Sequence, residues 1–518
     1  MSFVGRTAPP SVLFDSEDDR VNATGATKPA CFADLHLDQI VEAITANWAE
    51  YNLKPFFYYS LNRTDTISYR HEVFRDLESQ PLLADVKSFA TRMRDVRAYV
   101  TLANKLYYRF HKEAWLLHAI STYCDAIQQL SAKLNNTPIR SRGFLAFRDY
   151  LTQYATGLSF VPLMRTARQL TVELSNVNYC VLIRDNSLTV QEQQSQIDYS
   201  AEIEETFKKF QQGDAKDYRV TYHSAPEDMN HIEAKILEFV GRLNSDLFSR
   251  LRRYCEQNTD FLDERIAAFD REVHFYIAYF DHIVQLRQTG LQFCYPDVSA
   301  TSKATHARDT FDLALAQKLT SQHATVVHND FYLIGKERII VVTGPNQGGK
   351  TTFARMFGQL HYLASLGCLT PGRETRLFLF DRIFTHFERQ EKVETLRGKL
   401  EDDLARVHVI FQHATPQSIV IMNEIFTSTT IQDELYLSRR VMERLCNFDI
   451  LCVWVTFLDE LSSFNERTVS MVSTVVPDNP TLRTFKIARR AADGLAYAMA
   501  IVEKYGLTRD QIMARVQP

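Results

Sequence analysis

The sequence lacks paired cysteines, an excess of positive charge and long apolar runs, and each absence excludes a class of protein. Its eight cysteines are scattered without a CxxC pair, as in a cytosolic protein with buried, reduced thiols. The net charge of −4 excludes a surface coated in positive charge, so any nucleic-acid surface must be a local patch. No run of about 18 apolar residues is present to cross a membrane. We therefore expect a cytoplasmic protein.

The chain is long and has the composition of an ordinary globular protein. A chain of 518 residues with 45% hydrophobic residues is expected to form roughly two to four domains. Residues 1–32 are polar, contain Pro, Ser and Thr, and lack the basic start and apolar stretch of a secretory signal, so we expect a flexible tail. Apolar residues repeat at helical spacing over residues 33–175, which predicts a helical, lever-like core.

Residues 176–295 combine a small β region with two long helices. Residues 179–190 are expected to form a strand, a turn and a strand, and residues 218–222 a further strand. Apolar stripes over residues 232–251 and 262–280 predict two long helices, each of nearly 30 residues and so roughly 40 Å in length. Long helices that carry a small β region at one end suggest a clamp or arm.

A β-branched strand followed by a glycine-rich loop predicts a phosphate site. Residues 337–343 form the strand, and the loop matches GxxxxGK[ST] before a helical pattern. Glycines let backbone N–H groups turn toward phosphate oxygens, and the helix N-terminus adds partial positive charge. The loop residues expected to contact ATP are Gly344, Pro345, Asn346, Gln347, Gly348, Gly349, Lys350, Thr351 and Thr352.

Two of these loop residues have distinct roles. We expect Lys350 to reach the β- and γ-phosphates and the Thr351 hydroxyl to bind Mg²⁺. A chance match in a glycine-containing turn is the competing interpretation, and the flanking strand and helix argue against it.

A second predicted strand, residues 418–422, ends in Asn423 and Glu424. An acidic residue at the carboxyl end of a strand beside the phosphate loop lies where an attacking water must be, so Glu424 is the predicted general base or water-orienting residue, with Lys350 as the other catalytic residue. A helix-capping or salt-bridged carboxylate is the alternative for Glu424. Asn423 stands where such enzymes place a Mg²⁺-binding aspartate, and it keeps the oxygen but not the charge.

The order of motifs over residues 296–518 resembles the ATPase domain of the MutS family, which is related to ABC-type ATPases. Residues 344–352 are similar to the family's GPNMGGKST, and residues 381–385 to its DRIFTR. Residues 414–425 resemble AT..SLVLLDEI, and residues 455–461 stand in place of ATHYHEL. The resemblance implies an α/β P-loop ATPase domain with a mostly parallel sheet, preceded by the mainly α-helical core with its small β clamp.

The resemblance also implies that two subunits pack head to tail and that each completes the other's ATP site. Residues 397–403 are similar to the family's RSTFMVEM, which implies that Gly398 offers its N–H to the γ-phosphate across the dimer. Lys399 adds a cation there or is an ordinary solvated lysine. Residues 426–430 keep the hydroxyls of the family's GRGTS but lose both glycines. Phe457 replaces the family's histidine and Asn423 its aspartate, and these two losses together imply slow hydrolysis.

The weaker resemblance upstream covers residues 35–295 and concerns architecture only. The helical core begins near residue 35, so we expect a shortened member without the mismatch-reading N-terminal domain. The leading hypothesis is therefore a homodimeric, ATP-hydrolysing clamp on branched, single-stranded or distorted duplex DNA. Candidate phosphate contacts are Arg184, Lys208, Lys209 and Lys216, for which a solvated face is the competing interpretation.

Two other functional classes remain open at this point. A regulatory or structural nucleotide switch would hydrolyse ATP slowly or not at all and act on a protein partner. A nucleotide kinase is disfavoured, because no lid or second-substrate motif follows the phosphate loop. Salt-dependent DNA binding separates the first hypothesis from the second.

Overall fold

The computed structural model describes residues 10–184, 187–193, 229–388, 398–476, 479–492, 508–509 and 512–513. The chain divides into two compact units. The first contains the chain up to Arg75, the short piece Ser141–Gly143 and everything from Arg271 onward, and the second contains Asp76–Arg140 and Phe144–Asp270. The division thus differs from the expected boundaries at residues 175 and 295. No helix among the described residues is long and apolar enough to span a bilayer.

A six-stranded sheet forms the centre of the first unit. Its strands, in spatial order, are β10 (Ile383–His386), β11 (Ile419–Asn423), β12 (Leu451–Val455), β7 (Ile339–Thr343), β13 (Thr468–Val476) and β14 (Asn479–Arg489). All neighbours are parallel except β13 and β14. Strands buried on both faces need continuous apolar side chains, which β7, β11 and β12 have. The expected mixed α/β architecture with a mostly parallel sheet is confirmed.

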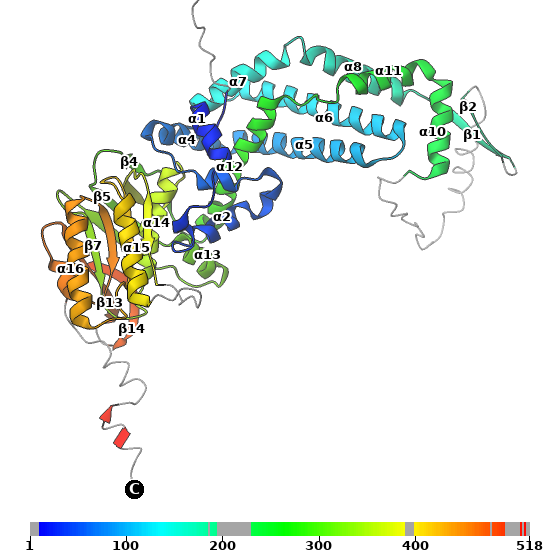
Figure 1. Ribbon diagram of the computed structural model, residues 1–518. Coiled ribbons are helices and arrows are strands. Elements are labelled where there is room, and N and C mark those ends of the chain that lie inside the picture. Colours follow the sequence, from blue (N-terminus) through cyan, green and yellow to red (C-terminus); the bar gives the residue numbers. More distant parts are fainter. Residues whose placement is uncertain are drawn as a thin grey trace, which may run out of the picture. The chain divides into compact units, whose positions relative to one another are not determined.

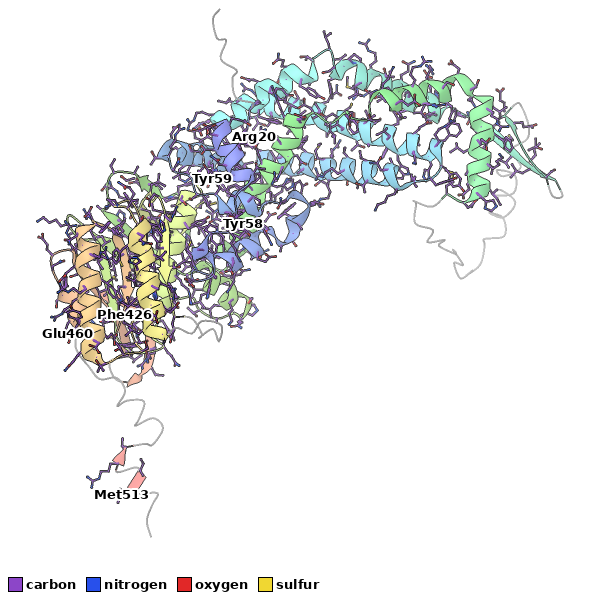
Figure 2. The ribbon with its side chains drawn as sticks, in the orientation of Figure 1. Arg20, Tyr58, Tyr59, Phe426, Glu460 and Met513 are labelled. Carbon is purple, nitrogen blue, oxygen red and sulfur yellow. The ribbon has the colours of Figure 1, made fainter. Side chains whose placement is uncertain are left out.

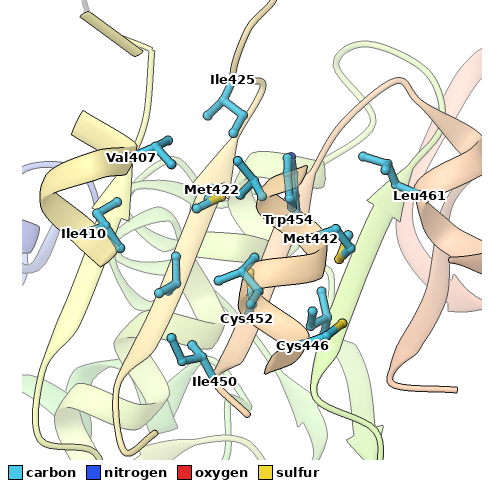
Figure 3. Packing of buried hydrophobic residues seen from close by; sticks show 14 of the residues in the cluster. Val407, Ile410, Met422, Ile425, Met442, Cys446, Ile450, Cys452, Trp454 and Leu461 are labelled. Carbon is cyan, nitrogen blue, oxygen red and sulfur yellow. The ribbon is translucent and has the colours of Figure 1, made fainter. Parts of the chain in front are cut away.

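Helices cover both faces of this sheet (Figure 1). On one face, α15 (Lys399–His413) and α16 (Ile431–Asn447) pack against alternate residues of the central strands in a cluster that includes Met422, Met442 and Trp454 (Figure 3). The opposite face receives α14 (Lys350–Ser365), where Gly358 approaches Ile421 so closely that a Cβ would lie 2.8 Å from its Cδ1. Successive side chains of each strand point to opposite faces of the sheet, so the sheet has one hydrophobic core on each face.

The remaining elements of the first unit are two further sheets and several helices. Strands β4 (Asp297–Ser299), β9 (Glu374–Phe378), β5 (Thr305–Thr310) and β6 (Asn329–Leu333) form one sheet in that order, and β3 (Phe293–Cys294) pairs with β8 (Thr370–Pro371). The helices lying wholly or partly in this unit are α1 (Glu17–Thr24), α2 (Leu37–Thr45), α3 (Lys54–Tyr58), α4 (Thr64–Leu77), α12 (Glu264–Gln288) and α13 (Leu313–Ser321), with the 3-10 turns η1 (Ala30–Phe32), η2 (Ala46–Tyr51) and η3 (Asp459–Ser463).

Described residues before position 33 pack into this unit, which corrects the expectation of a flexible tail. Val12 is fully buried and its carbonyl accepts a hydrogen bond of 2.6 Å from the Tyr276 hydroxyl. Helix α1 follows, and the Tyr59 hydroxyl, labelled in Figure 2, donates to Asp19 Oδ1 at 2.8 Å. A short apolar run within a polar segment carries too little periodicity to predict such burial, because its partners lie hundreds of residues later in the chain.

The second unit is mainly helical. Its elements are α5 (Gln80–Lys105), α6 (Arg109–Asn136), α7 (Arg142–Ala155), α8 (Phe160–Ser175), β1 (Tyr179–Arg184), β2 (Ser187–Glu192), α10 (His231–Leu243) and α11 (Ser245–Gln257), with part of α12. Helices α5 and α6 run side by side as an antiparallel pair (Figure 1). The expected strand, turn and strand is present as the antiparallel β1–β2 hairpin.

The helix expected over residues 232–251 is two helices. It is interrupted at Asn244 between α10 and α11, where the backbone leaves helical geometry and the Asn244 amide donates to the Val240 carbonyl at 3.1 Å. An asparagine side chain that bonds the backbone competes with the helical pattern, and the apolar stripe gives no sign of it. Helix α12 is continuous, as expected. The strand expected at residues 218–222 lies outside the described residues.

Candidate functional site

The glycine-rich loop connects β7 to α14 in a conformation that needs glycine. Gly344 has φ of 110° and Gly349, the N-cap of α14, has φ of 89°, values that favour glycine over other residues. A Cβ on Gly348 would lie 2.1 Å from Ser473 Oγ, and that hydroxyl donates to the Gly348 carbonyl at 2.7 Å. Through Ser473, strand β13 therefore contacts the loop and stabilises its conformation. This strand–loop–helix arrangement is the context in which backbone N–H groups bind phosphate.

The Lys350 side chain is folded back into the loop. Its Nζ donates to the Gly344 and Pro345 carbonyls at 2.9 and 3.3 Å, and its side chain is only 4% exposed. Nζ also lies 4.0 Å from the centre of the Phe457 ring and 3.9 Å from Glu424 Oε1. Burial lowers the pKa of Lys350 to about 8, although the Glu424 carboxylate acts in the opposite direction. An anionic ligand would restore the preference for the charged ammonium.

Oxygen atoms from two elements meet beside Lys350. The Thr351 hydroxyl donates to Asn423 Oδ1 at 2.8 Å, which joins the start of α14 to the end of β11. Glu424 follows with φ of 53°, and its N–H donates to the Val455 carbonyl at 2.9 Å. The structure thus brings Lys350, Thr351, Asn423 and Glu424 into one site. A hydroxyl and an amide oxygen are the types of ligand that Mg²⁺ accepts.

A buried carboxylate from α15 holds the turn after Glu424. Asp403 Oδ2 accepts a hydrogen bond of 3.2 Å from the N–H of Phe426, whose φ is 63°, and Asp403 Oδ1 lies 3.3 Å from His386 Nε2 (Phe426 is labelled in Figure 2). Burial acts to raise the pKa of Asp403, but the His386 contact and the Phe426 N–H outweigh burial and lower it. Sequence reasoning missed both residues, although Asp403 ends one segment that it had singled out, residues 397–403, and His386 directly follows another, residues 381–385.

An apolar cavity of about 270 Å³ opens beside the N-terminus of α14. Its walls are formed by Phe311, Asp312, Leu315, Leu319, Thr325, Val326, Val327, Asn329, Gly349, Thr352, Phe353, Met356 and Phe485. The Asn329 side chain fixes one wall, since its amide donates to the Phe485 carbonyl at 3.2 Å and its Oδ1 accepts from Ile487 N–H at 2.7 Å. A cavity of this size and lining next to a phosphate loop suits a planar base. No motif could have revealed it, because β14 and the segment before β6 are distant in sequence.

The residues expected to contact a second subunit or DNA lie in other parts of the chain than the group around Lys350. Gly398 is the exposed N-cap of α15 with an extended backbone, φ −65° and ψ 156°. The Lys399 ammonium lies 2.5 Å from Glu388 Oε1, so its charge is paired. Arg184 ends β1 and pairs in register with Ser187. Lys208, Lys209 and Lys216 lie outside the described residues.

Comparison with known proteins gives one family and a set of distant relatives. Residues 340–514 match the family described as MutS domain V. The DNA mismatch repair protein MutS of Thermotoga sp. (strain RQ2) is 24% identical over 192 residues, 36% of this chain and 24% of that protein. MutS of Thermotoga neapolitana is 23% identical over 274 residues, which are 52% of this chain and 32% of that protein. MutS of Fervidobacterium nodosum is 26% identical over 172 residues, which are 33% of this chain and 21% of that protein. The chain therefore matches a third or less of the length of these relatives.

Proposed function

Because this chain belongs to the MutS family through its match to MutS domain V, we propose that it is an ATPase that acts on DNA. The observation that carries the proposal is the group formed by Lys350, Thr351, Asn423 and Glu424. Thr351 is hydrogen-bonded to Asn423 at 2.8 Å, and Lys350 Nζ lies 3.9 Å from Glu424. These distances bring an ammonium, a hydroxyl, an amide oxygen and a carboxylate into one small volume.

Each part of an ATP–Mg²⁺ complex has residues suited to hold it. The loop N–H groups from Gly344 to Thr352 and the Lys350 ammonium would bind the phosphates. Thr351 and Asn423 would hold Mg²⁺, which when bound neutralises phosphate charge. The cavity between Val326 and Phe485 would receive the base. The uncharged Asn423 favours weaker metal binding than an aspartate would.

Glu424 is the proposed residue that orients and deprotonates the attacking water. Its side chain is one-quarter exposed, so water can reach it, and its backbone is held at positive φ by the Val455 carbonyl and by the Asp403–Phe426 hydrogen bond next in the chain. A carboxylate held in a fixed direction does not have to be reoriented during the reaction.

The proposal extends to assembly and substrate. Two subunits would share each ATP site, with Gly398 at the N-terminus of α15 offering its N–H to the partner's γ-phosphate. The substrate would be branched, single-stranded or distorted duplex DNA, bound without base readout, and the protein would work in the cytoplasm. Gly398 is exposed, and no described residue beyond its chain neighbours lies within 4 Å of a Cβ placed there, which is compatible with contact to a second chain.

The test is ATP turnover by the purified chain at several protein concentrations, alone and with branched or single-stranded DNA. Glu424→Gln is expected to lower turnover by roughly 10²- to 10⁴-fold while ATP still binds, because a positioned base contributes about that much. Glu443→Gln changes an exposed glutamate of α16 in the same unit, outside the motifs named above, and serves as the matched control, with turnover unchanged. Wild-type turnover in Glu424→Gln would contradict the assignment.

A nucleotide-binding switch acting on a protein partner is the second candidate. The contact that favours it is the Phe457 ring 4.0 Å from Lys350 Nζ, at the position where the family pattern has histidine. A phenyl ring cannot donate a hydrogen bond to a phosphate. ATP binding without turnover under every condition above, and without salt-dependent DNA binding, would favour this second function.

A further inference from the structure

The turn between α5 and α6 presents two tyrosines at the surface of the second unit. Tyr107 is 89% exposed, an unusual degree for a large aromatic side chain, and its ring lies edge-on to that of Tyr108 with centroids 5.4 Å apart. Helix α5 ends at Lys105 and α6 begins at Arg109, so the rings project from the connection between two long helices. We call residues 105–112 the tyrosine tip.

The tyrosine tip is basic within an acidic chain. It contains Lys105, Arg109 and Lys112 and no acidic residue, whereas the whole chain has a net charge of −4. Arg109 and Lys112 lie in the first turn of a helix of 28 residues that has no acidic residue there. Cations at that end oppose the helix dipole and destabilise the helix slightly. The helix dipole therefore does not explain their placement.

The base of the tip is firmly attached to the unit. The Phe110 ring packs edge-on against Phe248 of α11 with centroids 4.9 Å apart. Gly241 of α10 lets this ring approach, since a Cβ there would lie 2.8 Å from Phe110 Cζ. The Arg109 guanidinium lies 4.5 Å from the centre of the Phe110 ring, and its Nε lies 3.6 Å from Glu113 Oε1. A ligand that stacks on the tip would therefore meet a surface that is already ordered.

We propose that the tyrosine tip binds unpaired bases of DNA, an inference that rests on the DNA-binding part of the proposed function. An exposed aromatic ring provides a stacking surface for any base, and neighbouring cations attract the phosphates on either side. In an intact duplex the base faces are already stacked on each other, so the tip distinguishes single-stranded or branched DNA from regular duplex. In the sequence, the tip is separate from the β1–β2 hairpin.

The test compares binding of a fluorescently labelled oligothymidine and of a duplex by anisotropy. Tyr107→Ala is expected to weaken single-strand binding by about ten- to a hundredfold, and Tyr107→Trp to retain it, because tryptophan also stacks. Lys105→Ala is expected to reduce the slope of log affinity against log salt by about 0.7. Leu158→Ala is the matched control, since Leu158 is 96% exposed at another interhelical turn of the same unit.

The outcomes separate the tip from the wider function. If the wild type binds single strands and Tyr107→Ala binds them equally well, the tip is not the site and the proposed function stands. If Tyr107→Ala and Leu158→Ala weaken binding equally, the effect is not one of stacking and the tip proposal fails. If the wild type binds no form of DNA, both the tip and the DNA-binding function are overturned. Thermal melts of each variant establish that it is folded.

Discussion

Lys350 is buried among groups that affect its proton affinity in opposite ways. Removal from water disfavours the ammonium, while the Glu424 carboxylate and the Phe457 ring favour it. Burial prevails, and the pKa of Lys350 falls to about 8. The proton on Lys350 is thus less firmly held than that of an ordinary lysine, which makes it responsive to the arrival of phosphate.

The affinity for ATP is therefore expected to depend on pH around the pKa of Lys350, about 8. Below pH 8 the free protein already carries the ammonium that phosphate needs. Above pH 8 the binding step must also take up a proton, so the dissociation constant should rise by up to about tenfold per pH unit. Calorimetric titration with ATP and Glu424→Gln protein between about pH 6 and 9.5 measures this, since hydrolysis is suppressed. Because this variant lacks the carboxylate that raises the pKa of Lys350, its ATP affinity should begin to fall below pH 8.

Two further variants, each made in the Glu424→Gln background, check the assignment to Lys350. Lys350→Met should bind weakly and without this pH dependence. Lys336→Met changes an exposed lysine paired with Glu466 and should behave as the parent protein does. An affinity that stays constant from pH 7 to 9 in the parent protein would show that the Lys350 ammonium does not bind the phosphates.

At the scale of elements, one side chain connects α15 with the turn that follows β11. Asp403 accepts the Phe426 N–H while lying 3.3 Å from His386 of β10. Asp403→Leu should leave a buried N–H without its acceptor and cost about 1–3 kcal/mol in the free energy of unfolding. It should also lower kcat with little change in KM, because Glu424 lies two residues before Phe426. Urea unfolding and steady-state kinetics measure the two effects.

The conservative variant distinguishes positioning from general damage. Asp403→Asn keeps an oxygen acceptor for Phe426, so it should retain most of kcat while it loses the charge next to His386. If Asp403→Leu lowers stability and leaves kcat intact, Asp403 supports the fold and does not position Glu424.

Elements with local signals could be predicted from the sequence, and those that depend on distant partners could not. The strand–loop–helix around residues 339–365 and the β1–β2 hairpin follow from short-range patterns. The burial of Val12, the Asp403–Phe426 hydrogen bond and the cavity wall at Phe485 each join segments far apart in the chain. Single-sequence periodicity carries no information about such pairs.

At the scale of the whole molecule, charge limits how DNA can be held. A net charge of −4 gives no general attraction to a polyanion, so affinity must come from local groups such as the tyrosine tip. Few phosphate contacts imply a shallow dependence of affinity on salt. Stacking, which depends little on salt, would then contribute a large share of single-strand binding.

The proposed dimer can be tested at Gly398 without disturbing the fold. Among the described residues, and apart from its chain neighbours, no atom lies within 4 Å of a Cβ placed there, and its backbone is in the extended region that any residue adopts. Gly398→Asp should therefore fold and even stabilise α15 by a few tenths of a kcal/mol, because aspartate is a good N-cap. The same carboxylate would repel a γ-phosphate presented by the partner subunit. Turnover should fall by tenfold or more, while a variant that is only damaged would also melt earlier.

Gly398→Ser supplies the matched comparison, since it caps the helix equally well without charge. It should keep or raise turnover, and its dependence on protein concentration should follow that of the wild type. Sedimentation of both variants in the Glu424→Gln background with ATP measures assembly directly. Gly398→Asp should shift the equilibrium between dimer and monomer toward monomer, and Gly398→Ser should not. If Gly398→Asp hydrolyses ATP and assembles as the wild type does, the N-terminus of α15 faces no phosphate, and the site of each subunit is complete without a partner.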